Sequence, residues 1–201
     1  MGEAPGQYFE AEPGARSIPS SVRLDLPDVS FTLATDRGVF AGERVDAGTK
    51  YLLLESPSPS ASGTFVDLGC GYGPIACTLA ARAPAATVWA VDVNRRALDL
   101  CRRNAASAGL TNVTAVEPDA VPADLAVDLI WSNPPIRIGK PALHALLTTW
   151  LRRLRPDGHA VLVVQKHLGS DSLQKWLTAE GWGTTRLGSR AGYRLLQVTP
   201  R

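Results

Sequence analysis

The sequence TFVDLGCGYG, residues 64–73, joins a short apolar run to three closely spaced glycines. The run TFVDL has the length and composition of a buried strand, and the proline at position 74 is tolerated in the first turn of a helix. The glycines remove Cβ atoms from the turn, so its backbone can approach a ligand at the helix N-terminus. This stretch therefore predicts a strand–turn–helix unit with a ligand site at the turn.

The rest of the chain repeats this alternation of strands and helices. Apolar runs of strand length occupy residues 87–91, 112–116, 126–130 and 159–164. Helical patterns begin at Pro74, Asn94, Pro141 and Ser170, where Asn94 and Ser170 are expected caps, and the helix from Pro141 is expected to include Leu154. Residues 182–199 are predicted to form two strands around a glycine-containing turn. This alternation predicts βαβ units, and therefore a parallel sheet covered by helices on both faces.

The sequence predicts one α/β domain that follows a short tail. Residues 1–20 contain three prolines, three glycines and little periodicity, so we expect them to be poorly ordered. Residues 21–34 predict two short strands, 50–55 a short helix and 56–63 a loop. The domain, 21–201, would then combine N-terminal strands and a substrate or cofactor loop (21–56) with a Rossmann-like core (64–201). That core is a seven-stranded, mostly parallel sheet with a C-terminal antiparallel hairpin.

Composition favours a cytoplasmic globular protein. The chain has 201 residues and is 45% hydrophobic, enough for one core, and no apolar run has the length needed to cross a bilayer. The N-terminus lacks a secretory pattern, and three cysteines without metal-ligand spacing predict reduced thiols and no bound metal.

Charge is distributed unevenly along the chain. Residues 1–136 contain 10 Lys and Arg against 16 Asp and Glu, whereas residues 137–201 contain 11 against 3. A basic C-terminal third suits a polyanionic partner, and the alternative is a solvated, arginine-rich helix face.

Polar or glycine-rich features follow each of the first four strands of the predicted core. They are the turn Gly69–Gly73, then Asp92, Asp119 and Asn133. Because the carboxyl ends of parallel strands meet at one edge of a sheet, where ligands bind in such folds, we expect these features to form one site.

The spacing within this site favours an adenosine-type ligand with a cationic amino-acid end. A dinucleotide fingerprint requires G-x-G-x-x-G, whereas the turn has G-x-G-x-G with Asp67 two residues before it. An acidic residue there would repel a pyrophosphate and would suit an amino group. Asp92, 23 residues after Gly69, is placed to accept both hydroxyls of a ribose.

The motifs VDLGCGYG, VDVN and WSNPP, in that order, resemble those of the class I S-adenosylmethionine-dependent methyltransferases. More narrowly, TDRGVF, RVDAGT, DLGCGYGPIA and SNPPIRIGK resemble the small-subunit ribosomal RNA (guanine-N2) methyltransferase family in its single-domain form. The resemblance covers roughly residues 30–198. It implies S-adenosylmethionine as the cofactor and RNA, of the small ribosomal subunit, as the partner, with neither a metal nor a membrane.

The resemblance also implies roles for individual residues. Gly69, Gly71 and Gly73 would pack against the methionine part of the cofactor, and Asp67 would lie near its amino group. Asp92 would bind the ribose and Val93 would lie against the adenine. Asp119 would hydrogen-bond the adenine amino group, with Glu117 as the competing residue. Gly48 and Thr49 match the family's N-terminal cofactor-contacting segment.

Asn133 stands where the fourth strand must end, because two consecutive prolines follow it. The Asn133 side-chain oxygen and the Pro134 carbonyl are suitable acceptors for the two N–H bonds of an amino group on a base. Pro135 and Ile136 would contact the substrate. Ile136 has no aromatic face to stack on a base, so stacking would come from elsewhere, such as Phe40. Arg137 and Lys140, with Lys166 and Arg190, would meet phosphates.

From these residues we predict an S-adenosylmethionine-dependent N-methyltransferase that acts on guanine in small-subunit ribosomal RNA. Within enzymes, the alternatives are a protein glutamine N-methyltransferase and a small-molecule methyltransferase. An RNA-binding scaffold that retains the fold is the non-enzymatic alternative, and an NAD-dependent dehydrogenase is disfavoured by the glycine spacing.

Overall fold

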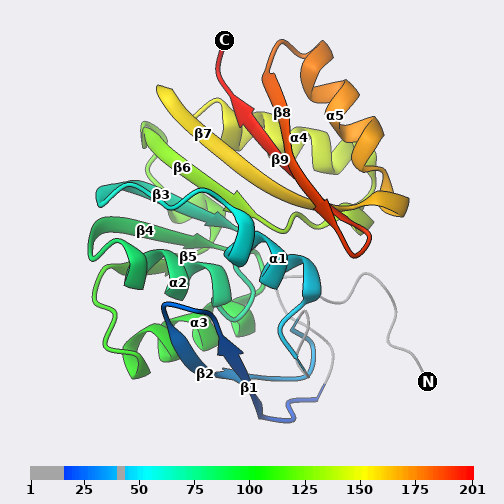
Figure 1. Cartoon of the computed structure of the whole chain (residues 1–201). Coiled ribbons are helices and arrows are strands. Elements are labelled where there is room, and N and C mark those ends of the chain that lie inside the picture. Colours follow the sequence, from blue (N-terminus) through cyan, green and yellow to red (C-terminus); the bar gives the residue numbers. More distant parts are fainter. Residues whose placement is uncertain (1–15, 40–43) are drawn as a thin grey trace.

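The computed structural model describes residues 16–39 and 44–201, which form a three-layer α/β domain around a seven-stranded sheet (Figure 1). The strand order is β5-β4-β3-β6-β7-β9-β8. The first five of these strands are parallel, and β9 runs antiparallel to both β7 and β8. The strands are β3 (Ser62–Leu68), β4 (Ala85–Val91), β5 (Val113–Val116), β6 (Val127–Ser132), β7 (Leu154–Gln165), β8 (Gly183–Arg190) and β9 (Tyr193–Thr199). The predicted seven-stranded, mostly parallel sheet with a C-terminal hairpin is confirmed.

The chain reverses its direction of winding between β3 and β6. From β3 it proceeds outward to β4 and β5, and then β6 returns to pair with the free side of β3, with Asp67 opposite Trp131. The carboxyl ends of β3 and β6 therefore lie side by side, and the connections that follow these two strands run toward opposite edges of the sheet. Such a switch point leaves a crevice outside the strand ends, which is where ligands bind in open α/β sheets.

Helices cover both faces of the sheet, as predicted. Phe65 and Val66, neighbours in β3, lie on opposite faces and belong to two separate hydrophobic cores. The first core includes α1 (Ala47–Glu55), α2 (Pro74–Arg82) and α3 (Arg95–Ser107), and the second includes α4 (Lys140–Leu151) and α5 (Ser170–Ala179). The central strands β3 and β6 are apolar on both sides because each side is buried against helices, whereas the edge strand β8 is largely exposed.

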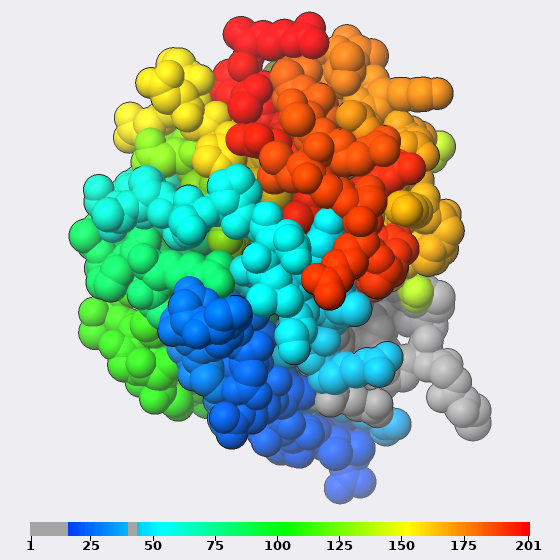
Figure 2. All heavy atoms as spheres, in the orientation of Figure 1, coloured from blue at the N-terminus to red at the C-terminus, as the bar shows by residue number. Residues whose placement is uncertain are grey.

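The N-terminal strands form a separate two-stranded hairpin, β1 (Ser20–Asp25) with β2 (Ser30–Thr35), beside α3 (Figure 1). The buried side chain of Asn104 in α3 binds this hairpin. Asn104 Oδ1 accepts the Ala34 N–H at 2.7 Å, and Asn104 Nδ2 donates to the Ala34 carbonyl at 2.9 Å. In Figure 2, α1 occupies the surface between this hairpin and the C-terminal hairpin.

Some predicted boundaries differ from the structure. The helix α4 ends at Leu151, and Leu154 instead begins β7, where it pairs with Val127. The cap of α5 is Gly169, in a left-handed conformation, so Ser170 is the first helical residue and its side chain makes no capping bond. Of the predicted disordered tail, residues 1–15 lie outside the described part. Ser17 and Ile18 donate hydrogen bonds to the Asp36 carboxylate, and Ser20 is already in β1.

The described residues contain no helix long and apolar enough to span a bilayer. Residues 16–39 and 44–201 also contain no group of three or more His, Cys, Asp or Glu side chains arranged to hold a metal ion. All three cysteines are free and buried.

Candidate functional site

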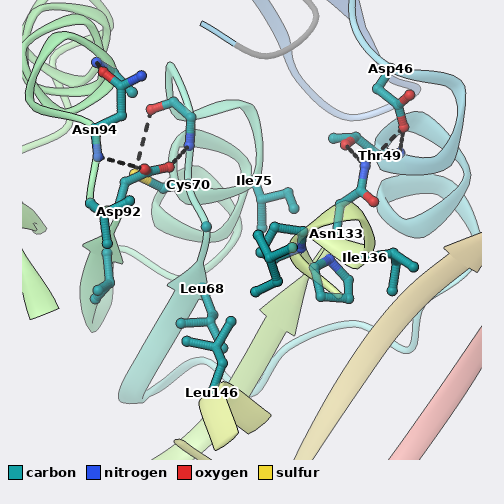
Figure 3. A pocket seen from close by; sticks show the side chains of 18 of the residues that line it. Asp46, Thr49, Leu68, Cys70, Ile75, Asp92, Asn94, Asn133, Ile136 and Leu146 are labelled. Atoms are coloured by element: carbon teal, nitrogen blue, oxygen red, sulfur yellow. Dashed lines mark hydrogen bonds between the residues drawn. The ribbon is translucent and has the colours of Figure 1, made fainter. Parts of the chain in front are cut away.

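A cavity of about 500 Å³ opens at the carboxyl ends of β3, β4 and β6 (Figure 3). Its volume lies in the range of small-molecule and cofactor sites. The predicted site residues in its wall are Thr49, Gly69, Gly71, Asp92, Val93, Asn133, Pro134, Pro135, Ile136 and Arg137. The sequence predicts that Asp92 and Asn133 belong to one site, and in the structure both line this cavity.

The glycine-rich turn is held to the sheet by its own backbone. The N–H groups of Gly69 and Cys70 donate to the Val91 carbonyl at the end of β4, at 2.8 and 3.0 Å. A Cβ atom built on Gly71 would meet no heavy atom within 4 Å, so this residue opens onto the cavity. A Cβ on Gly73 would lie 2.6 Å from Cys101 Sγ, so this glycine permits α3 to pack closely and does not line the cavity.

Asp92 is the carboxylate that faces the cavity from β4. It is half-buried, and its two oxygens accept the N–H groups of Gly71 at 2.8 Å and Asn94 at 2.9 Å (Figure 3). Burial raises the pKa of the Asp92 carboxyl above its ordinary value, and the N–H groups of Asn94 and Gly71 oppose that rise. Each carboxylate oxygen has a second lone pair, so Asp92 retains the capacity to accept two hydroxyl groups. Val93, next in the chain, is 42% exposed beside it.

Asp67 lies behind the cavity wall. It is fully buried, its Oδ2 accepts the Ala76 N–H in α2 at 2.9 Å, and its Oδ1 has no hydrogen-bond partner in the described structure. Burial raises the pKa of the Asp67 carboxyl well above its ordinary value, and the nearby Asp92 charge raises it further. The structure thus places this side chain against the start of α2.

Besides Gly73 and Asp67, four predicted residues either do not line the cavity or lie outside the described residues. Asp119 is exposed in a short 3₁₀ helix, whereas the preceding Pro118 lines the cavity. The buried Gly48 packs against Tyr193, because a Cβ there would lie 2.5 Å from the ring. Lys140 is exposed at the start of α4, and Phe40 lies outside the described residues.

Asn133, at the end of β6, is joined to the start of α1. Its Nδ2 donates to Asp46 Oδ2 at 2.9 Å and to Thr49 Oγ1 at 3.0 Å (Figure 3). The same Asp46 oxygen caps α1 by accepting the N–H groups of Gly48 and Thr49. The Pro134 carbonyl accepts the Ile136 N–H at 2.8 Å, which leaves one of its two lone pairs.

From the sequence, no site role was assigned to several lining residues, among them Asp46 and Tyr72. Asp46 was quoted only within RVDAGT, and the signal available for it was a capping residue before a short helix. Tyr72 lies in the glycine-rich turn, and its hydroxyl is buried without a hydrogen-bond partner among the described residues. Burial raises the pKa of the Tyr72 hydroxyl, and the charge of Asp46 raises it further.

The cavity fits S-adenosylmethionine. Gly71 leaves room beside open backbone, Asp92 would offer paired acceptors to a ribose, and Val93 and Pro118 would supply apolar surface to a base. A seven-stranded sheet whose C-terminal strand β9 is reversed, with this site at its switch point, has the fold of the class I S-adenosylmethionine-dependent methyltransferases.

Comparison with known proteins gives the family. The model of the methyltransferase small domain matches residues 30–197, and the chain belongs to that family. An uncharacterized protein of Bacillus subtilis, YbxB, is 34% identical over 168 residues, which are 82% of this chain and 84% of the relative. The ribosomal RNA large subunit methyltransferase G of Photobacterium profundum is 30% identical over 81% of this chain and 46% of its own length.

A solved structure shares the fold. The T. thermophilus 16S rRNA N2 methyltransferase (RsmC), in complex with AdoMet and guanosine, superposes with a TM-score of 0.77 at 23% identity. The match covers 94% of this chain and 52% of that one. The chain therefore spans about half the length of the two ribosomal RNA methyltransferases that it matches.

Proposed function

We propose that this protein transfers a methyl group from S-adenosylmethionine to the exocyclic amino group of guanine in small-subunit ribosomal RNA. The names of its relatives support ribosomal RNA as the acceptor class, and they include enzymes of both subunits. The motif SNPPIRIGK and the solved relative with guanosine favour guanine and the small subunit.

The observation that carries this proposal is the orientation of the Asn133 side chain. Its nitrogen is engaged by Asp46 and Thr49, so its oxygen is the end of the amide that is left for a ligand. The residue lines the cavity together with Pro134. An acceptor at this position suits a substrate that presents N–H bonds.

Acceptors are what an exocyclic amino group requires. Its lone pair is delocalised into the ring, so the nitrogen is a poor nucleophile. S-adenosylmethionine, when bound, supplies a methyl group carried on a positively charged sulfur. Asn133 Oδ1 and the second lone pair of the Pro134 carbonyl would accept the two N–H bonds and turn the lone pair out of the ring plane. They would also stabilise the positive charge that forms on nitrogen before it releases a proton to water.

Basic side chains near the cavity mouth suit an RNA backbone. Arg137 lines the cavity and is exposed, and Lys140 and Lys166 are exposed on neighbouring segments. Arg190 is instead 3.2 Å from Glu55 in an exposed ion pair. Contacts of Lys and Arg with phosphates would position the RNA, and the cavity would select the base.

The test is methyl transfer from tritiated S-adenosylmethionine by the purified protein. Free ribosomal RNA, small subunits, large subunits and ribosomal proteins are offered separately, and labelled RNA is mapped by mass spectrometry. We expect label on the N2 atom of a guanine in small-subunit RNA. Label confined to protein or to large-subunit RNA would contradict the proposal. Asn133→Ala should reduce turnover to a small residual rate and retain cofactor binding by calorimetry, whereas loss of both would assign Asn133 to folding.

A further inference from the structure

We propose that Asp46 is a positioning residue for the reaction: its carboxylate forces the Asn133 amide to present oxygen, and not nitrogen, to the amino group that is methylated. This inference rests on the proposed function, in which Asn133 Oδ1 is the acceptor. It assigns Asp46 a role beyond that of a helix cap.

The hydrogen bonds around Asn133 determine which end of its amide faces the cavity. An amide nitrogen has two N–H bonds, and here one points to Asp46 Oδ2 at 2.9 Å and one to Thr49 Oγ1 at 3.0 Å. An ionised carboxylate can only accept, so rotation of the amide by 180° would place two oxygens against each other. Thr49 does not impose this choice, because a hydroxyl both donates and accepts.

Asp46 is itself held in place. Its Oδ2 accepts the N–H groups of Gly48 at 2.8 Å and Thr49 at 3.0 Å, so the first turn of α1 fixes the atom that contacts Asn133. Asp46 and Asn133 are 87 residues apart in the chain, and both line the cavity. The start of α1 and the end of β6 are thus joined by hydrogen bonds at the predicted place of reaction.

The charge of Asp46 should also assist the acceptor. A negative charge on the N–H side of an amide polarises it and makes its oxygen a stronger acceptor. A stronger acceptor in turn stabilises more of the positive charge that forms on the substrate nitrogen. Both effects therefore act through Asn133, and neither requires Asp46 to touch the substrate.

Substitutions at position 46 separate this role from capping. Serine and asparagine are good caps, so Asp46→Ser and Asp46→Asn should retain α1. The shorter serine does not reach Asn133. Asparagine can accept or donate, so it no longer dictates the orientation of the Asn133 amide. We expect kcat to fall roughly 10- to 100-fold in Asp46→Ser and by a smaller factor in Asp46→Asn, with little change in the Kd of S-adenosylmethionine.

A double-mutant cycle provides the decisive activity readout. In the Asn133→Ala background, Asp46→Ser should change residual kcat by less than about twofold, because the partner is already absent. The same loss in both backgrounds, or full activity of Asp46→Asn, would overturn the inference. Leu53→Val, a buried change in the same helix outside the cavity wall, controls for lost stability and should leave kcat unchanged.

A spectroscopic measurement tests the orientation of the Asn133 amide without requiring that the methyl acceptor be known. In ¹⁵N-labelled protein, the Asn133 NH₂ signals are identified by their loss in Asn133→Ala. We expect them to exchange slowly with water and to move toward solvent-like shifts in Asp46→Ser. Unchanged signals would refute the positioning role even in an active enzyme. If instead the signals behave as expected while RNA receives no label, the proposed function fails and the orientation by Asp46 stands.

Discussion

Substitution of Gly73 by alanine should destabilise the fold far more than the same change at Gly71. Both glycines have positive φ, +91° and +54°, so each alanine would incur a backbone cost of about 1–2 kcal/mol. At position 73 the new Cβ would also lie 2.6 Å from Cys101 Sγ and 3.3 Å from Cys101 Cα, in a helix residue with no exposed surface. Overpacking of a buried contact adds about 1–3 kcal/mol. The total for Gly73→Ala is therefore about 2–5 kcal/mol, a large part of the stability of an ordinary domain.

Urea denaturation of the two variants and the unmodified protein measures this difference. Gly71→Ala supplies the control for the backbone term, because its Cβ would meet nothing within 4 Å. Since Gly71 lines the cavity, calorimetry should show the larger loss of S-adenosylmethionine affinity in this more stable variant. Equal denaturation midpoints for the two variants would refute the assignment of Gly73 to helix packing.

Three further outcomes are expected. Asp92→Asn should weaken S-adenosylmethionine binding about tenfold or more, since a carboxylate is replaced as acceptor. In the unmodified protein, calorimetry should show this affinity falling as the pH is lowered through the raised pKa of the Asp92 carboxyl, whereas the affinity of the variant should not change with pH in this way. The raised pKa of Asp67 means that the folded chain keeps a proton that the unfolded chain releases, so the contribution of Asp67 to stability should fall as pH rises above about 4. Denaturation across pH measures this contribution as the difference between the profiles of the unmodified protein and Asp67→Asn. Asn104→Ala should lower the free energy of unfolding by about 2–4 kcal/mol in denaturation experiments, because the buried Asn104 amide also donates to the Tyr72 carbonyl at 2.8 Å and so joins β2 to the glycine-rich turn. A loss below about 1 kcal/mol would contradict that bridging role.

The elements of the core were predictable because each has a local signal. Strands such as β4 appear as short apolar runs, and Asn94 accepts the Ala97 N–H at 3.1 Å as its capping prediction requires. The start of β7 was not predictable in this way. Leu154 has the spacing of the apolar side of α4, yet it pairs with Val127, and the Val127 N–H donates to the Arg153 carbonyl at 2.8 Å. Pairing with a distant strand overrode the local helical pattern at that point.

The site shows the same division between local and distant causes. Asp92 and Asn133 could be predicted to line one site because each follows a parallel strand, and the carboxyl ends of parallel strands lie at one edge of the sheet. Which atoms they present depends on contacts that no spacing rule contains. The direction of the Asn133 amide is set by Asp46, 87 residues earlier, the cap of a helix that lies outside the βαβ repeat. A motif can therefore name the residue that faces the substrate, but the hydrogen bonds behind that residue determine whether it accepts or donates, and hence which substrates it suits.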